Sequence, residues 1–303
     1  MDPEKTFERR RLRDWILPRD PRHLRAALAL LVLLLAGESW VRRWTPTQTL
    51  STAHYAIRSS AAPAQTREVG QAVEALHAAY ASFFQDFARV HEPHPALPLN
   101  LYRDRREYRR CVRFVFWSEA MYRRPNCHAY YAAGTPSGHH WMVHEAVHQL
   151  NDQVAGWKLA KWLDEGIALY FSTGRLQDGK LDPSRVDPAT YPIWWLDSQA
   201  LSGDLGRDVR QARVIPLRAV LSGEGGPPLD RYFNLYYIHW WSLVRFLIEY
   251  DHGRFRRPFF TLIAEGGTRE SFEQNIGPLA SIEPLWYRYL QQQVAARSRL
   301  GSG

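Results

Sequence analysis

Two histidines four residues apart, His144 and His148, are the clearest candidates for metal chemistry in the chain, and Glu145 lies between them. Residues four apart lie one above the other on the same face of a helix, so both imidazoles can reach one ion. Glu145 borders that face, where a carboxylate can hold a water molecule on the metal. The spacing therefore predicts a helix that carries two metal ligands and a general base.

A catalytic zinc site needs a third protein ligand and an open position for water. Glu165 is the next strong candidate after His148, and it lies in the stretch 159–171, whose apolar residues recur at helical spacing. A second helix packed on the first can present this carboxylate to the ion, and Gly166 leaves room for the approach. In the alternative interpretation, Asp164 and Glu165 form the solvated face of an ordinary amphipathic helix.

The pairing of His-Glu-Ala-Val-His with Trp-Leu-Asp-Glu-Gly-Ile-Ala resembles the gluzincin metallopeptidases, most closely their peptidase MA-like branch. The resemblance covers residues 66–295, and its specific parts are these two motifs and a later tyrosine segment. It implies that His144, His148 and Glu165 bind zinc (Zn2+). It also implies that Glu145 activates water for the hydrolysis of peptide bonds.

The chain departs from the aminopeptidase N type of gluzincin in two places. That type has Gly-x-Met-Glu-Asn upstream of its metal helix, where residues 133–137 of this chain read Ala-Gly-Thr-Pro-Ser. It also places its third ligand two residues farther along the chain. A typical aminopeptidase activity is therefore not expected.

Gluzincins often stabilise the developing oxyanion with a tyrosine on a helix beyond the metal ligands. The resemblance gives this role to Tyr237 in the segment 236–244. Tyr236, Tyr232 and His239 remain alternatives, because each is close in sequence and each carries a hydrogen-bond donor.

Hydrophobic patterning predicts an α+β fold with a small sheet and a helical carboxy-terminal subdomain, and the resemblance implies that it is zincin-like, with an active-site helix and a catalytic domain at residues 66–298. The predicted helices outside the metal site are at 66–90, 217–221, 232–250, 255–263, 271–276 and 282–294. The predicted strands are at 98–102, 113–117 and 129–132, and residues 172–231 are predicted to be a loop-rich connector. By resemblance, the segment 128–133 before the metal helix borders the substrate.

The amino-terminal part of the chain predicts attachment to a membrane. Eight of the 39 lysines and arginines lie within residues 1–25, before an apolar run, so the net charge of +8 is partly local and no nucleic-acid motif accompanies it. The segment 26–44 is expected to be an uncleaved signal anchor, or else a signal peptide of a secreted protein. The basic tail is then cytoplasmic and the catalytic domain is extracytoplasmic. Residues 45–65 are expected to be a linker.

Four further residues have two interpretations each. Cys111 and Cys127, the only cysteines, form a disulfide if the domain is extracytoplasmic, or remain buried thiols. His139 and His140 are expected to start the metal helix and line the site without binding the ion, because three ligands are already complete.

The aromatic group Tyr191, Trp194 and Trp195 either walls a substrate cleft or belongs to the core, which is the commoner place for such residues. The expected substrate is a peptide or protein, and the sequence leaves the oligomeric state open. The main alternative function is a membrane-anchored binding protein that keeps the fold, and even the metal, without catalysis. Nothing in the sequence separates these two functions strongly, since every expected chemical group is present.

Overall fold

The computed structural model describes residues 28, 43–112 and 118–301. The chain divides into two compact units, and the larger one, residues 46–109 with 114–303, contains the candidate site.

Several predictions from the sequence concern residues outside this described part. These are the basic tail at 1–25, most of the anchor at 26–44 and the strand at 113–117. Among the helices that the structure does describe, none combines the length and the apolar character that crossing a bilayer requires.

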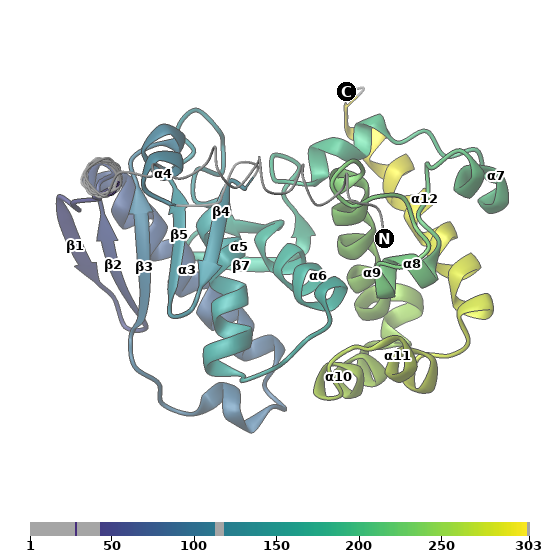
Figure 1. Ribbon diagram of the computed structural model, residues 1–303. Coiled ribbons are helices and arrows are strands. Elements are labelled where there is room, and N and C mark those ends of the chain that lie inside the picture. The colour runs from purple at the N-terminus through teal and green to yellow at the C-terminus, as the bar shows by residue number, and fades with distance from the viewer. Residues whose placement is uncertain (1–27, 29–42, 113–117, 302–303) are drawn as a thin grey trace, which may run out of the picture. The chain divides into compact units, whose positions relative to one another are not determined.

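The larger unit has a mixed α+β architecture, in which a small sheet is followed by many helices (Figure 1). The sheet has five strands in the order β1-β2-β3-β5-β4. The strands are β1 (Gln48–Ser51), β2 (Tyr55–Ser59), β3 (Leu97–Tyr102), β4 (Ala120–Arg123) and β5 (Asn126–Tyr130). Pairing is parallel between β2 and β3 and between β3 and β5, whereas β1 and β4 run antiparallel to their neighbours. Strand β4 is therefore an edge strand, and its free edge can border a cleft.

The segment 45–65 is not a linker, contrary to the expectation from its composition. It forms β1 and β2 and the start of helix α3 (Pro63–Phe83). Tyr55 and Ile57 alternate with less buried residues along β2 and point into the core, being 0% and 1% exposed. These residues belong to the folded unit.

Helix α3 and the metal helix α5 (His140–Gln149) contact each other and pack against the sheet. The buried residues of α3 recur at helical spacing, as expected, and include Val69, Val73 and Tyr80. The helix ends at Phe83, earlier than predicted, and a short 3₁₀ turn η1 (Ala88–His91) follows.

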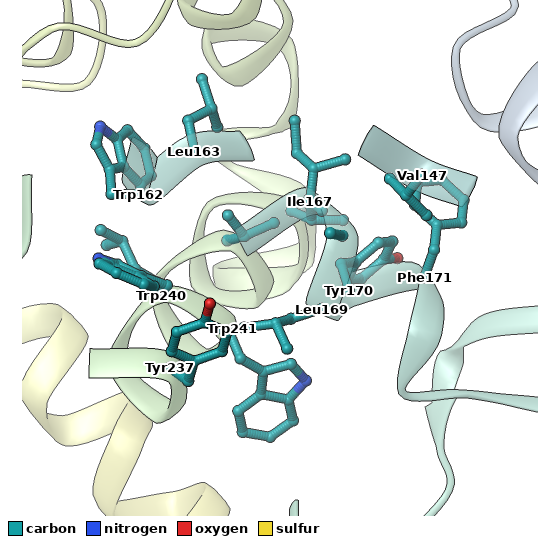
Figure 2. Packing of buried hydrophobic residues seen from close by; sticks show 14 of the residues in the cluster. Val147, Trp162, Leu163, Ile167, Leu169, Tyr170, Phe171, Tyr237, Trp240 and Trp241 are labelled. Atoms are coloured by element: carbon teal, nitrogen blue, oxygen red, sulfur yellow. The ribbon is translucent and has the colours of Figure 1, made fainter. Parts of the chain in front are cut away.

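Helix α6 (Lys161–Ser172) packs between α5 and α9 (Phe233–Gly253). Figure 2 shows side chains of α6 between Val147 of α5 and the aromatic residues of α9. A Cβ atom at Gly166 would lie 2.5 Å from Val244 Cγ2 and 2.9 Å from the carbonyl oxygen of Trp240. Gly166 is thus needed where α6 meets α9, not where it meets the metal helix.

The carboxy-terminal half is helical, as the periodicity predicted. Its helices are α8 (Leu217–Ser222), α9, α10 (Arg256–Ala264), α11 (Arg269–Asn275) and α12 (Leu279–Gly301). The connector at 172–231 has more regular structure than expected. It contains the hairpin of β6 (Gly174–Gln177) and β7 (Lys180–Val186), the 3₁₀ helix η3 (Ile193–Ser198) and the helix α7 (Leu205–Arg210).

Candidate metal centre

Helix α5 places the two histidines of the motif side by side. The Nε2 atoms of His144 and His148 lie 3.3 Å apart, and both rings are largely buried, with 8% and 12% of their side-chain surface exposed. The helical spacing of four residues accounts for this, because it stacks the two side chains on one face. The two nitrogen lone pairs can therefore converge on one ion.

Helix α6 brings Glu165 to the same point. Its Oε2 atom lies 3.4 Å from His144 Nε2 and 3.7 Å from His148 Nε2. Oε2 is buried without a hydrogen-bond partner. Burial by itself would raise the pKa of Glu165, but its contacts with the two histidines outweigh burial and lower that pKa. The carboxylate is thus held in its charged form beside both imidazoles.

The opposite ring nitrogen of each histidine is held by a second group. His148 Nδ1 donates to Asp164 Oδ2 at 2.8 Å, and His144 Nδ1 lies 3.4 Å from the Ser172 hydroxyl. These contacts at Nδ1 turn Nε2 of each ring toward Glu165, as outer partners of metal-bound histidines commonly do. Asp164 is therefore not the solvated residue that an amphipathic helix alone would suggest.

Asp164 is itself fixed by a chain of hydrogen bonds. Asn151 Nδ2 donates to Asp164 Oδ1 at 2.8 Å, and the Tyr80 hydroxyl donates to Asn151 Oδ1 at 2.8 Å. Asn151 lies in η2 (Leu150–Val154), a π-helical turn that continues α5. Sequence analysis missed Tyr80 and Asn151, because their partners are far away along the chain.

Glu145 lies beside the three candidate ligands and is 8% exposed. Burial raises the pKa of Glu145 and the nearby Glu165 carboxylate adds to the rise, although the two histidines oppose it. The backbone of Tyr122 on edge strand β4 also forms a hydrogen bond with this carboxylate. A carboxyl group with a raised pKa can both accept and return a proton near neutral pH.

Tyr237 of α9 faces the same centre from the helical side. It is 8% exposed and lines the cleft together with His144 and Glu145. Burial raises the pKa of Tyr237 well above its usual value, and the charge of Glu165 raises it further. Its hydroxyl therefore stays protonated and available as a hydrogen-bond donor.

The alternatives to Tyr237 have other partners. The Tyr236 hydroxyl donates to the carbonyl oxygen of Pro227 at 3.0 Å. His239 is fully buried, and its Nδ1 lies 2.6 Å from the carbonyl oxygen of Leu235. Tyr232 precedes α9 and lines a separate surface cavity. Of the four candidates, Tyr237 is the one that reaches the cleft.

Two cavities meet at His144 and Glu145. A polar cavity of about 350 Å³ and an aromatic cavity of about 460 Å³ both include His144 and Glu145 in their walls. The polar one is lined further by Tyr122, Asn151, Asp152, Trp157 and Asp164. The aromatic one is lined further by Tyr130, Trp141, Tyr191, Trp194 and Phe233. A molecule bound at the ligands can extend into both.

Apart from Glu145 at the catalytic end, the charged groups Arg105 and Glu119 in the wall of the aromatic cavity pair with each other. Glu119 pairs with Arg105 and Arg109, and it also accepts a hydrogen bond of 2.6 Å from the Tyr130 hydroxyl. The cavity therefore presents rings and satisfied polar groups rather than an available charge. Such a wall favours a neutral, apolar side chain.

Strand β4 borders the polar cavity, whereas the predicted segment 128–133 borders the aromatic cavity. Ala120, Met121 and Tyr122 line the polar cavity. Of the predicted segment, Tyr130 and Ala132 reach only the aromatic cavity. The reason is topological: β5 lies between β3 and β4, so the free edge belongs to β4.

His139 and His140 do not line either cavity, contrary to expectation. They do start the metal helix, His139 as its N-cap and His140 as its first residue. His139 Nδ1 lies 3.1 Å from Glu68, and His140 Nδ1 lies 3.0 Å from the carbonyl oxygen of Ser172. Each ring thus has a protein partner at Nδ1.

Two of the three connector aromatics do wall the cleft. Tyr191 is 7% exposed, so it is both a core residue and part of the aromatic cavity. Trp194 is 41% exposed and lines the same cavity. Trp195 faces the separate surface cavity instead.

Cys111 and Cys127 are not joined by a disulfide. Cys127 is a fully buried thiol whose Sγ lies 3.2 Å from the carbonyl oxygen of Glu145. It thus packs β5 against the metal helix.

The chain matches no protein-family model, and comparison with curated proteins gives no match. Its function must be inferred from its own residues.

Proposed function

We propose that this protein is a zinc-dependent peptidase. One observation carries the proposal, namely that His144 Nε2, His148 Nε2 and a carboxylate oxygen of Glu165 lie within 4.8 Å of one another. Glu145 and Tyr237 flank this group in a cleft large enough for part of a peptide. We further propose the gluzincin type, of the peptidase MA-like branch, on the zincin fold.

The donor atoms suit zinc. Two imidazole nitrogens and one carboxylate oxygen are a ligand set typical of catalytic zinc, which keeps a further position for water. The buried Glu165 Oε2 has no hydrogen-bond partner, so an ion beside it would satisfy that charge. When bound, zinc would lower the pKa of a water molecule and polarise the substrate carbonyl.

Glu145 is proposed as the general base. Its carboxylate takes one proton from the attacking water, whose oxygen bonds to the carbonyl carbon of the substrate. The same carboxyl group then gives that proton to the amide nitrogen as the C–N bond breaks. Burial raises the pKa of Glu145 above its usual value, which makes the carboxylate a stronger base for the first step.

Tyr237 is proposed to donate a hydrogen bond to the substrate carbonyl oxygen as negative charge develops there. Its buried hydroxyl remains protonated during this step. A donor held in place before the reaction typically contributes about 10² to 10³ in rate.

The cleft suggests a substrate class. The aromatic cavity suits a large apolar side chain next to the cleaved bond, since Arg105 and Glu119 in its wall already pair with each other. Edge strand β4 offers its backbone to an extended peptide, which could add to the sheet. We propose peptides or proteins with an aromatic or large aliphatic residue at this position.

The proposed location rests on the sequence alone. The basic residues at 1–25 and the apolar segment 26–44 support a membrane-anchored protein with its catalytic domain outside the cytoplasm, or a secreted one if the segment is cleaved.

The proposal is tested with zinc analysis and a peptide-library cleavage assay on wild type and Glu145→Gln. Glutamine is nearly isosteric and cannot accept the proton, so we expect unchanged zinc content and turnover reduced at least about 10²-fold. Wild type that binds zinc and cleaves no peptide would favour the non-catalytic binding protein. Cleavage at the wild-type rate by Glu145→Gln would remove Glu145 as the base.

Tyr237→Phe deletes only one hydroxyl group. We expect the turnover number to fall at least about tenfold while zinc content and melting temperature are unchanged. Tyr236→Phe is the matched control, because that hydroxyl donates to Pro227 outside the cleft. If the control loses activity and Tyr237→Phe does not, the oxyanion donor has been assigned to the wrong tyrosine.

A further inference from the structure

Three histidines gather on the surface of the larger unit, and none of them lines the cavities of the catalytic centre. His54 follows β1, His77 lies on α3, and His94 lies in the loop before β3. The His54 and His77 rings stack with centroids 3.6 Å apart, and the His77 and His94 centroids are 5.4 Å apart. Separate elements of the fold thus bring metal-binding side chains together.

The contact between His77 and His94 joins two potential ligand atoms. Their Nε2 atoms lie 3.1 Å apart. His94 Nδ1 donates to the carbonyl oxygen of Pro95 at 2.9 Å, which leaves the Nε2 of the neutral ring as an acceptor. One proton, carried by His77 Nε2, therefore lies between the two nitrogens. A metal ion would be bound by both nitrogens once the His77 proton moves from Nε2 to Nδ1, which keeps the ring neutral.

His54, the third histidine, restricts the orientation of the His77 ring. Glu74 accepts hydrogen bonds from His54, from the backbone N–H at 2.8 Å and from ring Nδ1 at 2.7 Å. This fixes the plane of the His54 ring, and stacking then restricts the ring of His77. Carboxylate and carbonyl partners on Nδ1 are the contacts that orient histidines in metal sites.

We propose that His77 and His94 form a second site for a divalent transition-metal ion such as zinc or copper. The separation of their Nε2 atoms, 3.1 Å, is close to the 3.3 Å between the corresponding atoms of His144 and His148. Two nitrogens at about 2.0–2.1 Å from one ion are separated by about this distance.

The second site is weaker than the catalytic centre. Among the described residues, the catalytic group is the one set of three or more ligand side chains whose atoms lie within 4.8 Å. Water molecules must therefore complete the coordination at His77 and His94. Imidazole ligands bind copper more tightly than zinc, so copper is the stronger test ion.

The protonation of His77 suits metal binding at neutral pH. Burial, together with the neighbouring His54 and His94, lowers the pKa of His77 to about 4. The ring is then neutral at pH 7, so binding a cation does not have to displace a second proton from it.

Zinc titration of the metal-free protein at pH 7 tests the proposal by calorimetry. We expect two zinc-binding events in wild type, one strong and one weak. His77→Gln and His94→Gln should each abolish the weak event and keep the strong one. His144→Ala should do the reverse, so failure of either site is distinguishable from failure of the other. His91→Gln is the matched control, because His91 is an exposed histidine three residues before His94.

Two results would overturn the second site. One is a single zinc equivalent in wild type, and the other is a weaker event that persists in both glutamine variants. A second, independent test adds copper to protein that already holds one equivalent of zinc. Its electron paramagnetic resonance spectrum should show coupling to two imidazole nitrogens, and His94→Gln should lose one of them. The His94 variant keeps the test valid if the more buried His77 variant fails to fold.

Discussion

Replacing Gly166 with alanine is expected to destabilise the protein and weaken metal binding. The added Cβ atom would lie 2.5 Å from Val244 Cγ2 and 2.9 Å from the carbonyl oxygen of Trp240. Carbon atoms attract each other at about 3.5–4.0 Å, so both contacts are repulsive. Val244 can change its rotamer, but the Trp240 carbonyl is part of the backbone of α9. Helices α6 and α9 must therefore move apart.

Two effects of opposite sign determine the size of the change. Alanine is favoured over glycine inside a helix by about 1 kcal/mol. Overpacking a tight interior typically costs about 1–3 kcal/mol. Because one clash is with backbone, we expect overpacking to exceed the gain in helix propensity, with a net loss of up to about 2 kcal/mol. Glu165 precedes Gly166 directly, so the shift also displaces a metal ligand, and a shift of about 1 Å can reduce a rate about 100-fold.

Urea denaturation and zinc affinity measure both consequences. Gly206→Ala in α7 is the matched control, since its Cβ would meet the side chains of Asp204 and Arg210 at 3.4 Å, an ordinary contact. That variant should be as stable as wild type or more so. Val244→Ala combined with Gly166→Ala should recover part of the lost stability. A Gly166→Ala protein with wild-type stability and zinc affinity would refute the close-packing argument.

Two further substitutions test the second layer of the site and the pH dependence of folding. Asp164→Asn removes the charge that orients His148, so it should weaken zinc binding about 10- to 100-fold in a chelator competition. The control Asp152→Asn should keep the zinc affinity of wild type. Equal zinc affinities of the two variants would contradict the role assigned to Asp164. Burial lowers the pKa of His239 from 6.5 to about 4, so its contribution to stability is present above pH 6.5 and is lost as the pH falls toward 4. Between pH 7 and pH 5 this loss is about 2 kcal/mol. Urea denaturation of His239→Gln should show a pH dependence smaller by that amount, and an unchanged dependence would rule out the buried ring as its source.

The helices and the pairing of His144 with His148 could be predicted because their signals are local. The spacing of His144 and His148 acts through one helix, and long apolar periodicity located α9 and α12 to within a few residues at their amino-terminal ends. Glu165 could be chosen because its helix carries a strong apolar face. These features depend on residues three and four apart.

The sheet and the cleft were harder to predict because they depend on pairing between distant segments. Strands β1 and β2 are four and five residues long and contain serine and threonine, so their composition is that of a linker. Strand β4 is an edge strand because of the order of the strands in the sheet. This order cannot be predicted from the sequence of any single segment. The position of Trp194 in the cleft wall depends likewise on how the connector folds back.

The orientation of His148 shows why a motif alone does not define a metal site. The spacing brings the ring to the correct helix face, yet either of its nitrogens could then point at the ion. Asp164 on α6 selects Nε2 by accepting from Nδ1, and Asn151 and Tyr80 hold Asp164 in place. Asp164 directly precedes Glu165, so the same turn of α6 would supply one proposed ligand, Glu165, and orient another, His148. Packing of α6 against α5 and α9 therefore sets the geometry of the whole ligand group, which is why Gly166, with no side chain of its own, is expected to control it.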